Sequence, residues 1–303
     1  MVRVIDMECS APTSAVQQWG DTTPPRHPEG SGLSWMGQEP QKRPGWGFDN
    51  YDEIFGARRE RDGEAGPIQQ SFEEFNAELE ANGVEKAFMA HPNPITVAAV
   101  RARPDLYMGL ARLSPYDGML GVREFERLVR EDGLCGLMIQ PLEERLPASD
   151  RRYYPLYTKA AELGLPIRIY STMNYATDRP YDLGHPSHLD QVAGDFPETP
   201  IIAGLGGWPW INEMVALVRR HPNLYVDTAA HHPRYFATPG SGWEMLMQFG
   251  NTLIQDKVLA AFSPATLGEP YAAMIEAYLD LPLKDAVKEK WLFGNAARLF
   301  EID

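Results

Sequence analysis

Short runs of apolar and β-branched residues recur along the chain, and most are followed by a segment with helical periodicity. Strands that alternate with helices form parallel sheets, and eight such strands close a (β/α)8 barrel. We therefore expect an α/β fold of the TIM-barrel type, with an open, doubly wound sheet as the alternative. The eight runs lie at residues 2–8, 85–91, 106–113, 134–140, 166–171, 200–205, 223–228 and 257–263.

Three of the intervening segments carry clear helix signals. Ser71 and Glu74 have the spacing of a capping box, and Gly83 is placed to end that helix. Residues 122–131 and 211–220 repeat apolar positions at helical spacing. Their predicted buried faces are Val122, Phe125, Leu128 and Val129, ending at Gly133, and Ile211, Met214, Val215 and Val218, ending before Pro222.

Residues 11–70 interrupt this alternation. They are rich in Pro, Gly and Trp and show no period, and so long a connection is usually functional or disordered. Because they follow the first strand, in a barrel they would lie on the carboxyl-terminal face, where active sites form. We expect a lid over the pocket, with Trp46 as a candidate substrate contact; a surface insertion is the alternative. No linker divides the chain, so residues 1–303 are expected to form one domain.

Composition narrows the class of protein. The 303 residues include 28 Lys and Arg against 42 Asp and Glu, a formal net charge of −14. This balance argues against a general nucleic-acid or anionic-membrane binder. Cys9 and Cys135 are the two cysteines, so no disulfide framework or cysteine-rich zinc module is expected. No signal peptide and no long apolar span is visible, so we expect a cytoplasmic protein with no membrane partner.

Three sequence segments carry a family resemblance. Residues 5–8 (IDME), 206–228 (GGWPWINEMVALVRRHPNLYVDT) and 294–300 (GNAARLF) resemble the amidohydrolase-related barrels. The likeness is closest to the branch of aminocarboxymuconate-semialdehyde and resorcylate decarboxylases, and it runs over essentially the whole chain. It implies a distorted eight-stranded barrel, in which residues 11–70 form a long insertion after the first strand. It also implies a homodimer and a site for one divalent metal, usually zinc.

The sequence departs from the family at nearly every metal-ligand position. The resemblance places these positions on Glu8 and Ser10 of the first strand, Tyr170 of the fifth, Gly204 of the sixth and Ser263 of the eighth. Zinc takes three or four nitrogen, oxygen or sulfur ligands from the protein, and only Glu8 is a strong one. We therefore expect neither a metal nor another cofactor. No known ligand signature relates the other candidates, His91, His185, His188, His231 and His232.

Charged and hydroxyl side chains are expected where the metal would lie. Alternation along a strand puts Val4, Asp6 and Glu8 on one face, and Arg168 and Tyr170 on one face. The resemblance makes Glu8 and Tyr170 point into the barrel. An arginine inside a barrel is costly unless a carboxylate pairs with it, so we expect Arg168 to pair with Asp6 or Glu8. A buried ion pair without a chemical task is the alternative.

Further candidates lie near the predicted strand ends. Arg112 can form a fork on a substrate carboxylate, or it is a surface charge. Gln140 closes the fourth predicted strand, and we include it with Ser263 among the candidate substrate contacts. Asp227 precedes His231 closely, and an Asp that orients a His is a general acid–base pair. The alternative for Asp227 is to cap the next turn.

These residues predict a metal-independent enzyme that acts on a small carboxylated aromatic or ring-derived acid, with decarboxylation as the first choice. Arg168 or Arg112 would anchor the carboxylate, Tyr170 would polarise a phenol or carbonyl oxygen, and Glu8 would deliver the proton. Burial raises the pKa of such a carboxyl group and a neighbouring arginine lowers it. If Glu8 is bidentate to Arg168, the proton donor becomes His231.

Three other functions fit the same residues. One is hydrolysis, such as the opening of a lactone by water that Asp227 and His231 activate. Another is a cyclisation or isomerisation in a biosynthetic pathway. The last is a catalytically dead barrel used for binding or assembly, which the loss of family ligands would suit. Both the decarboxylation and the hydrolysis hypothesis predict a small organic anion as the binding partner.

Overall fold

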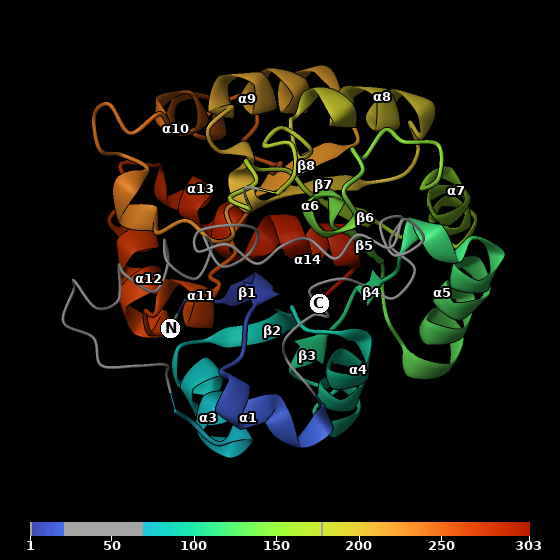
Figure 1. Cartoon of the computed structure of the whole chain (residues 1–303). Coiled ribbons are helices and arrows are strands. Elements are labelled where there is room, and N and C mark those ends of the chain that lie inside the picture. The colour runs from blue at the N-terminus through green and yellow to red at the C-terminus, as the bar shows by residue number, and fades with distance from the viewer. Residues whose placement is uncertain (1, 21–68, 177) are drawn as a thin grey trace.

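The computed structural model describes residues 2–20, 69–176 and 178–303. Their strands surround a common centre, most helices lie outside the strands while α14 (Asn295–Phe300) crosses one end of the ring, and every paired strand is parallel (Figure 1). The expected α/β barrel is confirmed. Its strands are β1 (Val4–Cys9), β2 (Val84–Met89), β3 (Tyr107–Met108), β4 (Ala111–Arg112), β5 (Leu137–Ile139), β6 (Ile167–Tyr170), β7 (Ile201–Gly204), β8 (Leu224–Asp227) and β9 (Val258–Leu259).

The barrel is distorted at two seams. Its strands form a three-stranded sheet, β1-β2-β3, and a six-stranded sheet that runs in order from β4 to β9. The predicted third strand, 106–113, supplies both β3 and β4 and so bridges the sheets; between them the N–H of Cys135 donates to the carbonyl of Gly109 (2.9 Å). At the other seam the N–H of Met7 donates to the carbonyl of Ala260 (3.1 Å). The eight expected runs therefore close one ring.

The three helices with clear sequence signals are confirmed. In the capping box, Glu74 N–H donates to Ser71 Oγ (3.2 Å) and Ser71 N–H donates to Glu74 Oε2 (2.8 Å). Gly133 ends its helix in the left-handed conformation, at φ +72°. The helices are α1 (Thr13–Val16), η1 (Gln17–Trp19), α3 (Phe72–Ala81), α4 (Asn93–Ala102), η3 (Pro115–Asp117), α5 (Met119–Asp132), α6 (Pro141–Glu144), α7 (Tyr154–Glu162), α8 (Ser187–Asp195), η4 (Leu205–Gly207), α9 (Ile211–Arg220), η5 (Pro233–Tyr235), α10 (Glu244–Gly250), α11 (Pro264–Leu267), α12 (Tyr271–Leu279), α13 (Asp285–Glu289), the π-helical η6 (Lys290–Gly294) and α14 (Asn295–Phe300).

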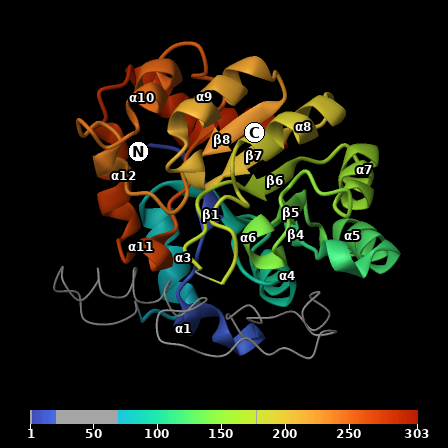
Figure 2. The ribbon, with the colours of Figure 1, turned by 45° about the horizontal axis from the view of Figure 1, so that its top comes forward.

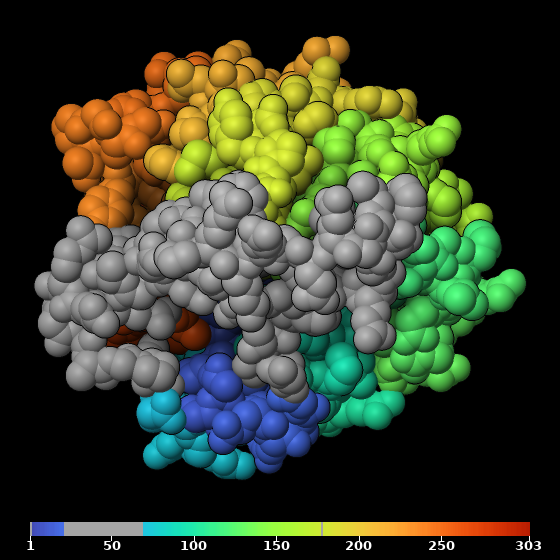
Figure 3. All heavy atoms as spheres, viewed as in Figure 1, coloured from blue at the N-terminus to red at the C-terminus, as the bar shows by residue number. Residues whose placement is uncertain are grey.

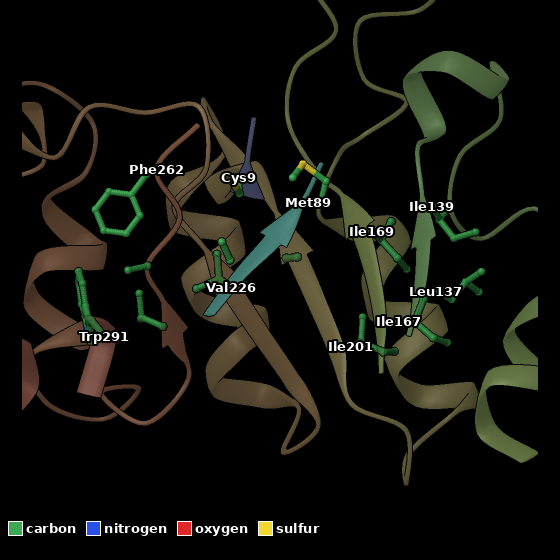
Figure 4. Close-up of a cluster of buried hydrophobic side chains, with 14 of the residues drawn as sticks. Cys9, Met89, Leu137, Ile139, Ile167, Ile169, Ile201, Val226, Phe262 and Trp291 are labelled. Atoms are coloured by element: carbon green, nitrogen blue, oxygen red, sulfur yellow. The ribbon is translucent and has the colours of Figure 1, made fainter. Parts of the chain in front are cut away.

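Two apolar clusters lie on the two faces of the strands. The larger one fills the space between strands and helices, and Figure 4 shows part of it, including Ile167 and Ile169 of β6. The smaller cluster lies inside the ring and contains Met138 of β5 and Ile202 of β7. Outside β7 and β8, α8 and α9 lie side by side in both views of the ribbon (Figure 2).

The two ends of the barrel differ. Phe293 of η6 and α14 pack against the inner cluster, and Arg3 Nη2 donates to the carbonyl of Asp303 (2.9 Å), which places α14 at the amino-terminal end of the strands. The opposite, carboxyl-terminal end carries the loops that follow each strand. No helix among the described residues is both long enough and apolar enough to cross a membrane.

The predicted lid falls mostly outside the described residues, since 21–68, with Trp46, are not among them. The described segments just before and just after residues 21–68 are held together. Ser14 Oγ donates to the carbonyl of Gln70 (2.8 Å) and accepts from its N–H (2.9 Å), and the ring of Trp19 meets Phe72 edge-on at 4.7 Å. These segments lie together at the surface (Figure 3). The lid itself stays a prediction.

Candidate active site

Arg168 lies wholly inside the barrel. Residues i and i+2 of a strand share a face, and Ile167 and Ile169 belong to the outer cluster, so Arg168 and Tyr170 face the interior. The side chain of Arg168 is 0% exposed, and its Nη1 lies 4.0 Å from the sulfur of Met138 in the inner cluster. A charge in this position needs partners, because an isolated buried ion is strongly disfavoured.

Two carboxylates bind the guanidinium. Arg168 Nε donates to Asp227 Oδ2 (2.7 Å), and Nη1 donates to Glu8 Oε2. The other oxygen of Glu8 accepts from the hydroxyl of Tyr170 (2.5 Å). Asp227 ends β8, Tyr170 ends β6 and Glu8 lies one residue before the end of β1. The carboxyl ends of three strands therefore bring these four side chains into one hydrogen-bonded cluster, the Arg168 cluster.

The prediction of an Arg168 ion pair is confirmed for Glu8 and wrong for Asp6. Pairing between β1 and β2 is irregular between Asp6 and Cys9, and this irregularity breaks the expected alternation. Met7 belongs to the inner cluster and Glu8 reaches Arg168, so two consecutive residues face inward. Asp6 faces outward instead. A bulge adds a residue to one strand and reverses the faces that follow it, which the sequence pattern alone does not reveal.

Asp6 is held between β1, the segment that follows β9, and α12. It accepts from the N–H groups of Glu8 (2.8 Å) and Phe262 (2.9 Å) and from the hydroxyl of Tyr271 (2.6 Å). Burial raises the pKa of Asp6 to about 7, although these hydrogen bonds act in the opposite direction. Asp6 therefore fixes the backbone of Glu8 and does not touch Arg168.

Gly204 leaves the space that the guanidinium and the Tyr170 ring use. It is the register partner of Tyr170 on the neighbouring strand. A Cβ at this position would lie 3.0 Å from Tyr170 Cδ1, 3.3 Å from Arg168 Nε and 3.4 Å from Arg168 Cζ. The resemblance places a metal-ligand position at Gly204, and the residue that offers no ligand there leaves room for the guanidinium.

The cluster fixes the protonation of its donors. Burial alone would lower the pKa of Arg168, but the carboxylates of Asp227 and Glu8 outweigh it and the pKa is raised. Burial and then the charge of Glu8 hold the pKa of Tyr170 well above 10, while Arg168 and Arg112 act to lower it. Arg168 is therefore a permanent cation and Tyr170 a neutral phenol that donates to Glu8.

Backbone groups complete the cluster. The N–H groups of Leu205 and Ala229 both donate to Asp227 Oδ1 (3.0 Å each), which leaves Oδ2 for Arg168. The N–H of Ser263 donates to the carbonyl of Glu8 (2.9 Å), and its Oγ accepts from the N–H of Ala230 (3.0 Å). Ser263 thus ties the loop after β9 to β1 and to the loop after β8.

The structure places Asp227 against Arg168 rather than against His231. His231 lies in the loop after β8, half-buried, with Nε2 3.2 Å from the carbonyl of Leu205. Its ring packs edge-on against Trp243 at 4.9 Å. The expected geometry of an Asp that orients a His is therefore wrong for this pair, because Asp227 directs its oxygens to Arg168 and to backbone N–H groups. His231 itself stays a candidate at the carboxyl-terminal end.

Arg112 and Gln140 also lie at the carboxyl ends of their strands. Arg112 ends β4, is 19% exposed and donates through Nη2 to Glu143 Oε2 of α6 (2.8 Å). Gln140 follows β5 as the buried residue at the start of α6. Arg112 and Arg168 are both register partners of Met138, which belongs to the inner cluster, so Arg112 lies at the level of Arg168 while part of it reaches the surface.

The described residues do not fit the metal that the resemblance implies. At the corresponding positions, Ser10, Gly204 and Ser263 offer weak ligands or none, and both oxygens of Glu8 are bound by Arg168 and Tyr170. Across residues 2–20, 69–176 and 178–303, no three or more His, Cys, Asp or Glu side chains are grouped to hold a metal ion. The guanidinium of Arg168 lies among these positions.

A cavity of about 840 Å³ lies at the opposite, amino-terminal end of the barrel. Its lining includes Lys86, Arg101, Asp132, Phe300 and the last residue of the chain, and it excludes every member of the Arg168 cluster. Arg101 and Asp132 are ion-paired with each other across it. Active sites of parallel barrels form at the carboxyl ends of the strands, so this cavity is not the candidate active site.

Comparison with known proteins identifies the family. The amidohydrolase family model matches residues 34–302. The chain belongs to the amidohydrolase family. This confirms the resemblance found in the sequence and makes the protein an enzyme of the lyase or hydrolase type. No curated protein sequence matches the chain.

Solved structures similar to this amidohydrolase share its barrel. An uncharacterized TIM-barrel protein from Bordetella bronchiseptica is 22% identical, with a TM-score of 0.72 and 99% of both chains covered. The 5-carboxyvanillate decarboxylase of Sphingomonas paucimobilis is 18% identical, with a TM-score of 0.67 and all of both chains covered. The 2,6-dihydroxybenzoate decarboxylase of Rhizobium is 16% identical, with a TM-score of 0.59, covering 78% of this chain and 90% of that one.

Two features of this amidohydrolase site escaped sequence reasoning. One is that Asp227 binds Arg168. A buried arginine needs carboxylate partners, and Asp227 is an acidic residue at the end of a predicted strand, so the sequence did contain a signal for this pair. The other is the steric role of Gly204. Its signal was the loss of a side chain on the strand that follows Arg168, which frees room in the same layer.

Proposed function

We propose that this enzyme removes CO₂ from a small carboxylated aromatic or ring-derived acid without a metal at the family position. The observation that carries the proposal is the guanidinium of Arg168, held by Glu8 and Asp227 at the carboxyl end of the barrel. Two solved structures with this barrel act, by name, on aromatic acids, 5-carboxyvanillate and 2,6-dihydroxybenzoate. Fixed charges and hydrogen-bond donors supply the electrostatic stabilisation that such a reaction needs.

The protein must hold the carboxylate that leaves as CO₂, and it must bind the ring system from which it leaves. The bond between the ring carbon and the carboxylate carbon breaks, CO₂ leaves, and the electron pair stays on the ring carbon, which takes up one proton. Arg112 anchors the carboxylate, since it is partly exposed at the carboxyl end of β4, where Glu143 is its ion-pair partner. Arg168 supplies N–H donors for an uncharged oxygen on the ring system, and Tyr170, whose single hydroxyl proton is donated to Glu8, holds that carboxylate in place.

His231 delivers the proton in this scheme. Glu8 is not bidentate to Arg168, but it accepts from Arg168 at one oxygen and from Tyr170 at the other, so it is arranged as an acceptor and not as the proton donor. Tyr170 has a raised pKa and keeps its proton. His231 is half-buried at the same end of the barrel, and an imidazole is suited to proton transfer near neutral pH.

Lactone hydrolysis fits the structure less well. It needs Asp227 and His231 to activate water together, and Asp227 is instead bound to Arg168 and to two backbone N–H groups. The predicted homodimer, the cytoplasmic location and the absence of nucleic-acid and membrane partners remain predictions from the sequence. A small organic anion is the partner that the proposed chemistry requires.

The test is CO₂ release from a panel of aromatic acids by protein treated with a chelator. We expect release to survive chelation, Arg112→Gln to raise KM and His231→Asn to lower kcat, with one solvent deuteron incorporated into each product made in D₂O. Arg130→Gln, which removes an exposed arginine paired with Glu126 on α5, is the matched control and should change neither constant. Activity that requires added metal, or oxygen-18 uptake from water without CO₂, would contradict the proposal.

A further inference from the structure

Arg168 has hydrogen-bonding capacity that the protein does not use. Among the described residues, its Nη2 is a buried side-chain atom without a hydrogen-bond partner, while Nε and Nη1 bind Asp227 and Glu8. Asn174, 7% exposed in the loop after β6, has a second such donor, Nδ2, at the same end of the barrel. A buried donor without a partner is destabilising, and more so when the group is charged.

The partner of Nη2 must be an acceptor. A guanidinium nitrogen carries only N–H donors and no lone pair that can accept, so a hydroxyl or carbonyl oxygen fits and an ammonium group does not. The three nitrogens of a guanidinium lie in one plane, and two of them are fixed by Asp227 and Glu8. Nη2 is therefore a donor with a set direction.

Charge selects the kind of oxygen. Glu8 and Asp227 already bring two formal negative charges to the one positive charge of Arg168. A carboxylate at Nη2 would add a third negative charge in a buried place, which strong repulsion opposes. An uncharged hydroxyl or keto oxygen can accept from Nη2 without that repulsion. Arg112 is ion-paired with Glu143 and 19% exposed, so solvent screens a carboxylate there better than at the wholly buried Arg168.

We propose that Arg168 Nη2 binds an uncharged hydroxyl or keto oxygen of the substrate, while Arg112 binds its carboxylate. This rests on the proposed function, and it restricts the substrate to acids that carry a hydroxyl or keto group at a distance from the carboxylate. The oxygen of the substrate then lies deep in the barrel and the carboxylate lies near the mouth. A water molecule offers the same uncharged oxygen and is the competing occupant.

Binding to the native protein tests this assignment. Dissociation constants are measured by calorimetry for benzoate, for the three hydroxybenzoate isomers and for the matching fluorobenzoates, in which fluorine replaces the hydroxyl and accepts hydrogen bonds poorly. We expect at least one hydroxy acid to bind about tenfold more tightly than its fluoro analogue, because the hydrogen bond to a charged donor is formed only with oxygen. If every hydroxy acid binds as its fluoro analogue does, water fills the position and the proposal is overturned; it is also overturned if no acid binds.

Two variants locate the effect. Arg112→Gln should weaken all the acids together, by about tenfold, and leave the ratio of fluoro to hydroxy dissociation constants unchanged. Arg168→Lys should remove that ratio; if this variant does not fold, the native ligand series and Arg112→Gln still decide the matter. A ratio that persists in folded Arg168→Lys, or disappears in Arg112→Gln, overturns the assignment. If the ratio is found but no acid releases CO₂, the proposed reaction fails while the oxygen site stands.

Discussion

Replacing Gly204 by alanine tests the shape of the Arg168 cluster with a single methyl group. The backbone at Gly204 has φ −75° and ψ +152°, which any residue adopts, so the substitution carries no backbone strain. The new Cβ would lie 3.0 Å from Tyr170 Cδ1 and 3.3 Å from Arg168 Nε, where about 3.5–4.0 Å is optimal. The ring and the guanidinium must therefore both shift.

The cost of this shift follows from packing. Overfilling a well-packed interior destabilises a protein by about 1–3 kcal/mol. We expect Gly204→Ala to lower the free energy of unfolding by that amount, because both neighbours are held by hydrogen bonds to Glu8 and Asp227. The same change at Gly194, exposed on α8 with no atom near the added Cβ, should instead raise it by about 0.5–1 kcal/mol.

Urea unfolding of the two variants and the native protein measures the difference. In an arginine-selective ¹H–¹⁵N spectrum, the Nε–H signal of Arg168 should lose protection from solvent exchange in Gly204→Ala and keep it in Gly194→Ala. If Gly204→Ala is as stable as Gly194→Ala, with the Arg168 signal unchanged, the space at Gly204 is not what positions the guanidinium and the reasoning is refuted.

Three further outcomes can be checked by urea unfolding. Asp227→Asn should lower the free energy of unfolding by about 3–5 kcal/mol, because it breaks a buried ion pair. Asp105→Asn, which breaks an exposed ion pair, should lower it by less than about 1 kcal/mol. Equal losses in the two variants would contradict the argument from burial. Asp6 has a pKa of about 7 in the fold against 3.8, so its contribution to stability is full below about pH 4 and lost as pH rises through 7. Between pH 5 and pH 8 the free energy of unfolding should therefore fall less in Asp6→Asn than in the native protein. If it falls equally with pH in both proteins, this reasoning is refuted. Burial lowers the pKa of His91 to about 4, so its contribution is lost as pH falls from about 6.5 to 4; His91→Gln should flatten that decline.

Much of the fold was readable because the strands of a parallel barrel are buried on both faces and appear as continuous apolar runs. The resemblance assigned Tyr170 to the interior, and alternation along the strand put Arg168 on the same face. The division of the run 106–113 into β3 and β4 was not readable, since it depends on which neighbour each half pairs with.

The members of the site were predictable where side chains alternate regularly between the two faces of a strand. Arg168, Tyr170 and Glu8 meet as expected, but Asp6 does not join them, because the irregular pairing of β1 turns Glu8 inward next to Met7. The sequence offered Asp227 as a second carboxylate for Arg168, but the contact between the two was not predictable. It depends on the relative positions of β6 and β8, which are not neighbours in the sheet.

The two hydrogen bonds between Ser14 and Gln70 have an evolutionary consequence. They bring the chain back to the point where it left the barrel, so the register of β1 against β2 does not depend on what is inserted there. Loop closure becomes only slowly more costly with length, by about 0.6 kcal/mol for each doubling. Selection can thus exchange, shorten or extend that insertion in descendants of this gene while the catalytic framework is inherited intact.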